Sequence, residues 1–351
     1  MFIAPRPELD DDPHFAVRIA LMPLIGLVLA MLLRSPLPMI YPTLMFSLIA
    51  GNRKAFNPGR VFAAPVVFGG ALWLMSGVVV MLQGIPLVLL TVMGVIYFLA
   101  FYMIQKTGTA FGMLIIVAGA LMSIMGLGSY PAMAYLRAEM GKAALCSAFV
   151  IPILYMLLPP RTREVHVDDA APSFDYGWGT RAAIRAVVML GYSLYLYTIL
   201  DFSNMMLAVA GMFVLVHSTR QSIWREAGQR SFSVLLGGSI GLGILTAMTI
   251  SSHLAVLLAL VFLATLWLGS KMLSGRLPAM AYQDAASVMI SLVGSALATS
   301  EPSFAFIQRA GLTVAGTLVA ALVVSILDAL LVKEPMTIAE AIADRNAQEN
   351  L

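Results

Sequence analysis

The chain has 351 residues, of which 60% are hydrophobic and 11% are charged, and its formal net charge at pH 7 is +3. Soluble domains carry roughly 25% charged residues, so this composition excludes an ordinary soluble protein. The basic residues are scattered over loops rather than gathered in a patch, which argues against a nucleic-acid partner.

From the N-terminus onward, apolar runs of about 17–25 residues follow one another, and this length spans the hydrocarbon core of a bilayer. Residues 1–15 are acidic and contain prolines, and they lack the basic-then-apolar order of a cleaved signal peptide. The runs predict twelve membrane-spanning helices, over residues 16–34, 37–51, 59–82, 84–104, 109–128 and 139–158 in the first half and 182–200, 203–218, 229–250, 253–272, 279–299 and 308–331 in the second.

The two halves carry matching residues at a nearly constant spacing. Arg18 recurs as Arg185, Gly69-Gly70 as Gly237-Gly238, and Arg137-Ala138 as Arg309-Ala310. Such a duplication is typical of transporters, whose related halves enclose a path on their shared axis. We therefore predict an all-α polytopic membrane protein built as a 6+6 parallel internal repeat. Its parts are a first six-helix module over 1–158, a cytoplasmic linker over 159–181, a second six-helix module over 182–332 and a cytoplasmic tail over 333–351.

The loop charges predict the orientation. With a cytoplasmic N-terminus, 17 of the 21 basic residues lie on the cytoplasmic side, and only Arg34, Arg137, Lys142 and Arg309 lie on the outer side. Cytoplasmic loops carry such an excess of Lys and Arg, so both termini are expected to be cytoplasmic.

Short motifs in the second half indicate a family. They are Arg181-Ala-Ala-Ile-Arg185 at the start of its first helix, a basic loop from His217 to Arg230, Gly237-Gly238 in the third helix, and Arg309-Ala-Gly-Leu-Thr313-Val-Ala-Gly316 in the sixth. This pattern resembles the fusaric acid resistance family of bacterial inner-membrane exporters, which includes aromatic carboxylic acid efflux pumps. The first half repeats the pattern more loosely, and it has Gly141 and Lys142 in place of Thr313 and Val314.

The resemblance implies a multi-pass protein of the bacterial inner membrane that exports small organic acids, with a periplasmic adaptor protein and an outer-membrane channel as partners. Many family members also carry a large cytoplasmic domain, for which this chain has no room, so it resembles a compact branch with two fused modules. Homo-oligomerisation stays open. The major facilitator superfamily is a competing interpretation, because residues 51–60 lie where that superfamily has its Gly-x-x-x-Asp-Arg-x-Gly-Arg-Arg loop, although the acidic residue is missing.

Ionisable residues near the membrane are the candidate site residues, because an unpartnered charge there costs several kcal/mol. Arg137 and Arg309 occupy equivalent positions, and two guanidiniums facing each other across an axis would bind a substrate carboxylate, with Lys142 about one turn further in. The alternative is that both arginines reach lipid headgroups. Arg18 and Arg185 lie at cytoplasmic helix starts, where they either anchor the helix or attract substrate.

Asp284 lies about one and a half turns into the eleventh predicted span, where a carboxylate could carry the proton of a proton-coupled transporter. Alternatively, it pairs with Lys271 or Arg276 near the helix end. Asp328 is expected to reach the surface near the end of the last span. The single cysteine, Cys146, excludes an intramolecular disulfide, and the four histidines have no ligand spacing, so we expect no metal and no cofactor.

These features predict a secondary transporter rather than an enzyme. The outer loops are short and poor in catalytic side chains, and the chain has no Gly-x-x-x-x-Gly-Lys-[Ser/Thr] nucleotide-binding loop. The leading interpretation is proton-driven export of small, aromatic organic acids by alternating access. A passive anion channel of the same architecture stays open, as does a structural subunit that docks an adaptor.

Overall fold

The computed structural model describes residues 12–52, 54–108, 111–164, 177–199, 211–217, 219–251, 253–296 and 302–332, and these residues form helices and connecting loops with no β-strand. The helices are α1 (Phe15–Leu32), α2 (Ile40–Ala50), α3 (Pro58–Leu82), α4 (Pro86–Thr107), α5 (Phe111–Gly128), α6 (Tyr130–Leu157), α7 (Trp178–Ile199), α9 (Arg220–Ile250), α10 (Leu254–Ser274), α11 (Ala279–Ala296) and α12 (Pro302–Leu331).

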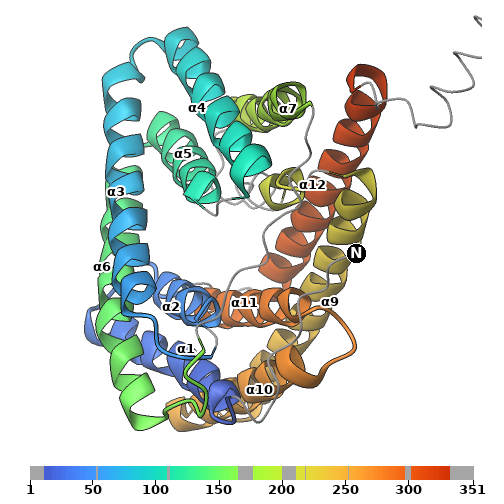
Figure 1. The fold of residues 1–351 in the computed structure, drawn as a ribbon. Helices are drawn as coiled ribbons and strands as arrows, with labels where there is room; N and C mark the ends of the chain where they lie inside the picture. Colours follow the sequence, from blue (N-terminus) through green and yellow to red (C-terminus); the bar gives the residue numbers. More distant parts are fainter. Residues whose placement is uncertain are drawn as a thin grey trace, which may run out of the picture.

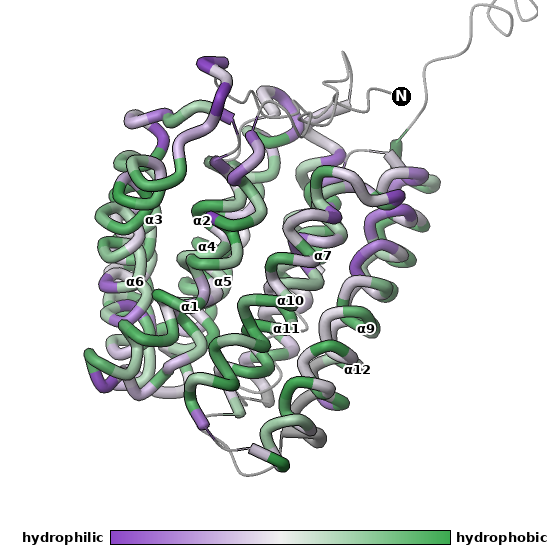
Figure 2. Tube along the Cα trace, turned by 90° about the horizontal axis from the view of Figure 1, so that it is seen from below, coloured by the Kyte–Doolittle hydropathy of each residue, from purple (hydrophilic) through white to green (hydrophobic). Residues whose placement is uncertain are grey.

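Eight of the described helices are long and apolar enough to cross a membrane, namely α1, α3, α4, α5, α6, α9, α10 and, over Ala310–Leu331, α12. Figure 2 shows green, apolar residues along the helices and purple, polar residues mainly toward their ends. The chain is therefore an all-helical, multi-pass membrane protein. Of the other predicted spans, 37–51 forms the shorter apolar helix α2, and 203–218 lies largely outside the described residues.

Two helices begin about two turns before the apolar runs that predicted them. α6 begins at Tyr130, and the Ser129 side chain caps its first turn by accepting from the Ala132 amide. α9 begins at Arg220, after a reciprocal cap between Thr219 and Ser222. Such caps satisfy amides that have no partner inside the helix, so they start a helix regardless of how polar its first turns are.

Helices from the two halves of the chain pack against each other. α1 packs on α10, and α4 packs on α7. At the first of these contacts, a Cβ added to Gly269 would lie 3.3 Å from the Cα of Ala16, and at the second, a Cβ on Gly94 would lie 3.3 Å from the Leu190 side chain. The two modules predicted from the sequence therefore share two large helix contacts.

Within each half, one long helix packs on two others. α3 contacts α5 and α6, and α9 contacts α11 and α12. Figure 1 shows α3 and α6 on one side of the molecule and α9 and α12 on the opposite side. The α9–α11 contact is the closest of these approaches, because a Cβ on Gly237 would collide with the backbone of Ala285. This contact brings polar residues of the two helices together.

Candidate functional site

Buried polar side chains gather at one end of the helix bundle. We call this the basic end, and it holds the loops that include residues 54–57, 158–164 and 217. One contact within the first half of the chain and one contact between the two halves lie here. The Arg18 guanidinium donates to the Leu158 carbonyl over 2.6 Å, and the Gln105 amide on α4 donates to the Val216 carbonyl over 3.1 Å. The segment that leads into α9 is thereby attached to the first half of the chain.

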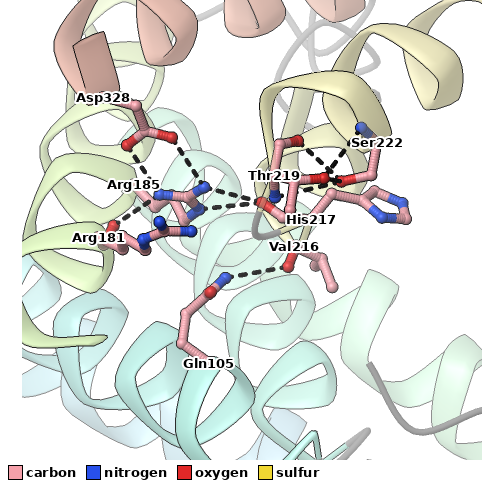
Figure 3. A network of polar contacts seen from close by, with 8 residues as sticks. All are labelled: Gln105, Arg181, Arg185, Val216, His217, Thr219, Ser222 and Asp328. Atoms are coloured by element: carbon pink, nitrogen blue, oxygen red, sulfur yellow. Dashed lines mark hydrogen bonds and ion pairs between the residues drawn. The ribbon is translucent and has the colours of Figure 1, made fainter. Parts of the chain in front are cut away.

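The centre of this end is Arg185 on α7, which is completely buried (Figure 3). Its guanidinium forms an ion pair with Asp328 on α12 at 3.2 Å and donates to the His217 carbonyl at 2.8 Å and the Arg181 carbonyl at 3.0 Å. The expectation that Asp328 reaches the surface was wrong, since its side chain is almost fully buried against this arginine. Arg185 thus fixes the backbone of His217 at the start of α9.

A second group, which we call the basic-end cluster, consists of His217, Glu226, Arg230 and Asp284. Arg230 Nε lies 2.8 Å from a Glu226 oxygen on the same helix, and a terminal nitrogen of the same guanidinium lies 3.4 Å from Asp284 on α11. The other Glu226 oxygen lies 3.4 Å from His217 Nε2. Phe213 covers one face of the guanidinium, with its ring centre 4.0 Å away.

Asp284 is therefore partnered, and its partner is Arg230. The alternative pairing of this carboxylate with Lys271 or Arg276 is not what the structure has. The reason is packing between helices: α9 and α11 approach closely at Gly237, which brings Arg230 within reach of the first turns of α11. The Asp284 side chain remains 22% exposed.

Arg18 on α1 is buried in a similar way in the first half. It forms an ion pair with Asp12, and its guanidinium stacks over the Tyr155 ring with 4.2 Å to the ring centre. Burial raises the pKa of the Asp12 carboxyl, although the charge of Arg18 opposes this. Arg18 and Arg185 both bond to groups of the protein itself, so each connects the first helix of its half to the last helix of that half.

Arg137, the first predicted anion-binding residue, lies in α6 toward the opposite end of the bundle. Its guanidinium stacks on the Trp73 ring at 3.7 Å from the ring centre and donates to Ser76 Oγ over 2.5 Å, both on α3. Within the described part of the chain, no carboxylate lies within ion-pair distance of Arg137, and its Nε is buried without a hydrogen-bond partner. This cation therefore keeps donor capacity that the protein does not use.

Lys142 is engaged with a carboxylate that the sequence did not draw attention to. Its Nζ donates to Glu139 over 2.8 Å, and Ser35 Oγ in the α1–α2 connection donates to the other Glu139 oxygen. Glu139 is almost fully buried, whereas the Lys142 side chain is 57% exposed. Lys142 neutralises this buried acid, which reduces the positive charge that it can offer to a substrate.

Arg309 lies in α12, and its side chain is outside the described residues. α6 and α12 occupy opposite sides of the molecule (Figure 1), so the helices that carry Arg137 and Arg309 are separated by other helices. Asp284 thus lies at the basic end, whereas Arg137 and Lys142 lie on α6 away from it. Each of the three side chains has its own partners.

Three ionisable residues of these clusters, Glu139, Glu226 and Arg230, were missed as site candidates by the sequence analysis. Glu226 precedes the apolar run of its helix, and Glu139 and Arg230 lie in the first two positions of theirs. The signal that could have found them is the pair of caps, because Ser129 and Thr219 start α6 and α9 early and draw these charges into the bundle. Among the described residues, no group of three His, Cys, Asp or Glu side chains is arranged to hold a metal ion.

A comparison with protein families matches residues 190–323 of the chain to a model described as fusaric acid resistance protein-like. The matched segment includes all of α9, α10 and α11 and most of α12, and hence the whole basic-end cluster. No curated protein and no solved structure matches the chain.

Proposed function

We propose that this chain, whose residues 190–323 match a model described as fusaric acid resistance protein-like, is a secondary transporter that exports small organic acids, in particular aromatic ones, across the bacterial inner membrane. The observation that carries the proposal is the Arg230–Asp284 ion pair, which lies between two packed helices of the matched segment. Charged side chains at such positions in membrane bundles mark substrate or proton pathways. The family match favours this assignment over the major facilitator superfamily.

The proposed architecture is a 6+6 parallel repeat with both termini in the cytoplasm and modules over 1–158 and 182–332. The packing supports it, because the first helix of each half contacts the fourth helix of the other, α1 with α10 and α7 with α4. The third helix of each half also contacts the fifth and sixth helices of its own half. The basic end is then the cytoplasmic end, as the loop charges indicate.

Asp284 is the proposed proton carrier. Its carboxylate is held by one cation across a helix interface and keeps part of its surface exposed. Protonation would remove the charge that holds Arg230 to α11, so it would weaken the α9–α11 contact and favour a change in which end of the bundle is open. Proton entry from the outside would thereby be linked to export of the acid.

Arg137 and Lys142 on α6 and Arg309 on α12 are proposed as separate anion-binding residues, because these two helices lie on opposite sides of the molecule. The unused donors of Arg137 and the Trp73 ring against it support binding of a carboxylate that belongs to an aromatic molecule. The partners proposed for the cell are a periplasmic adaptor protein and an outer-membrane channel, which would carry the acid across the rest of the envelope.

The test is accumulation of radiolabelled 4-hydroxybenzoate in everted inner-membrane vesicles, which export into their own lumen and need no adaptor. We expect respiration to drive accumulation and an uncoupler to abolish it. Valinomycin with potassium removes the membrane potential but leaves the pH gradient, so a proton-coupled exporter still accumulates the acid whereas a passive anion channel does not. Absence of energised accumulation of any aromatic acid tested would overturn the proposal.

The site residues are tested in the same vesicles. We expect Asp284→Asn to abolish accumulation driven by the pH gradient, because an amide cannot bind and release a proton near neutral pH as a carboxyl group can. The double change Arg137→Ala, Arg309→Ala should weaken uptake about tenfold or more, since hydrogen bonds between charged groups contribute about 1.5–3 kcal/mol each. The matched control is Arg161→Ala, an exposed arginine at the basic end.

A further inference from the structure

The basic-end cluster has a net charge that its own groups do not balance. His217, Glu226, Arg230 and Asp284 form one line of contacts, each within 3.4 Å of the next. If both acids are ionised and His217 is neutral, the cluster carries one negative charge in excess. An uncompensated charge in a partly buried site is costly, so the cluster is most stable when it holds one further proton.

Among the described residues, the charged groups that act on the two acids are those of the cluster itself, His217 and Arg230 on Glu226, and Arg230 and Glu226 on Asp284. Arg185 on α7 donates to the His217 carbonyl, but its charge is offset by Asp328 on α12. Arg181, one turn earlier on α7, contributes its carbonyl to Arg185. On the far face of Arg230 lies the apolar ring of Phe213. The groups that can accept the proton with the least disturbance are the two at the ends of the line, His217 and Asp284.

We propose that His217 and Asp284 share one exchangeable proton, so that uptake of a proton by Asp284 expels one from His217 into the solvent at the basic end. The balance is complete without a co-reactant: the Asp284 carboxylate becomes a carboxylic acid, and the His217 imidazolium becomes a neutral imidazole. Both states of the cluster are neutral. This inference rests on the proposed role of Asp284 in proton uptake, and it adds His217 as the group that releases the proton.

Glu226 and Arg230 have positioning roles in this arrangement. Arg230 lies between His217–Glu226 and Asp284 in this line of contacts, so its position links the two groups at the ends of the line. Glu226 neutralises Arg230 when Asp284 is protonated, which prevents a buried unpaired cation. The exposed fractions agree with a release function, because the His217 side chain is 38% exposed whereas those of Glu226 and Arg230 are 12% and 11%.

The experiment is a pH titration of the histidine side chains by NMR, on the full chain in lipid nanodiscs with isotope-labelled histidine. The chain has four histidines, and the His217 signal is identified by its absence in His217→Gln. Two interacting sites titrate as a coupled pair, so changing Asp284 must alter the protonation of His217.

The signs of the expected changes make the test specific. Asp284→Asn and Glu226→Gln each remove a negative charge and should weaken the proton affinity of His217 about threefold to tenfold. Arg230→Gln removes a positive charge and should strengthen it. The control Glu164→Gln removes an exposed carboxylate that pairs with Lys54 at the same end, and it should leave His217 unchanged. A variant that merely disturbs the fold would not give changes of opposite sign.

If the titration of His217 is the same in the natural chain and in Asp284→Asn, the proposal is overturned. If Asp284→Asn does not fold, Arg230→Gln takes its place, and an unchanged titration of His217 in that variant overturns the proposal in the same way. The titration uses no substrate, so its result does not depend on whether the protein exports 4-hydroxybenzoate. In everted vesicles, His217→Gln should slow uptake driven by the pH gradient and shift its pH profile, whereas His253→Gln at the opposite end should do neither.

Discussion

Arg185 keeps its charge inside the bundle because Asp328 and two backbone carbonyls surround it. A buried ion pair adds little stability compared with apolar residues of the same volume, but removal of one partner leaves the other charge uncompensated. The pair therefore specifies where α7, α12 and the start of α9 meet, rather than how stable the whole bundle is. His217 depends on it for its position.

Replacement of Arg185 tests this role. We expect Arg185→Gln to lower the free energy of unfolding by about 3–5 kcal/mol, because the Asp328 carboxylate is left buried without a counter-charge. Thermal denaturation of the detergent-solubilised protein measures the loss. Arg220→Gln, at an exposed position on the first turn of α9, is the control. Equal denaturation temperatures for the two variants would contradict the structural role.

At the level of single residues, the sequence pointed to a common role for matching arginines of the two halves, but it did not identify their ion-pair partners. The common spacing of Arg18 and Arg185 indicated a shared role, and both indeed connect the first helix of a half to its last. Their carboxylate partners were not predictable, because Asp12 precedes its own helix whereas Asp328 lies near the end of α12. Similarly, Asp284 stood out as a charge in an apolar run, but Arg230 is 54 positions away in the sequence.

Among the helices, the α9–α11 contact determines the geometry of the basic-end cluster. Gly237 has no side chain, so the backbones of α9 and α11 approach until the space for a Cβ is filled by Ala285. Any larger residue must push the two helices apart, and the same displacement would lengthen the 3.4 Å contact between Arg230 and Asp284. Packing of small residues between membrane helices commonly allows such close approaches.

A one-methyl change tests this dependence. We expect Gly237→Ala to destabilise the protein by about 1–3 kcal/mol, the usual cost of overpacking a tight contact, and to reduce energised accumulation of 4-hydroxybenzoate. Gly243→Ala, six residues further along the same helix, is the matched control, because a Cβ there meets no atom within 4 Å. If both variants behave like the natural chain, the close approach is not needed for the site.

The lengths of the helices show that hydropathy locates a helix but does not locate its ends. Apolar runs located the helices, but α6 and α9 each extend about two turns beyond their runs into charged sequence. These extra turns are helical because of caps and tertiary contacts, which a window of average hydropathy does not register. The residues missed as site candidates lie in or directly beside these turns, so the sequence predicted the scaffold of the candidate site but only part of its chemistry.

In the molecule as a whole, helices from the two halves of the chain pack against each other. α1 packs on α10 and α7 packs on α4, while α2 also contacts α11. The proposed repeat pairs residues of the two halves, but it does not predict which helix of one half lies against which helix of the other. That choice depends on the shapes of surfaces such as those at Gly269 and Gly94.

A crosslink tests whether this packing persists during transport. In a Cys146→Ser background, we expect Ala16→Cys and Gly269→Cys to form a disulfide on oxidation, because the two backbones lie in contact. If α1 and α10 move as one body, the crosslinked protein keeps most of its 4-hydroxybenzoate uptake. Loss of uptake on oxidation, restored by reduction, would instead mean that the two helices separate in each cycle.

The packing between the two halves has a consequence for how the protein is made. α1 is synthesised first, but α10, which covers part of its surface, is synthesised only after most of the chain has entered the membrane. Until then, lipid must cover the face of α1 that will later contact α10, and this is tolerable because acyl chains are as apolar as the side chains that replace them. The fold of the first half is therefore completed only when the second half arrives.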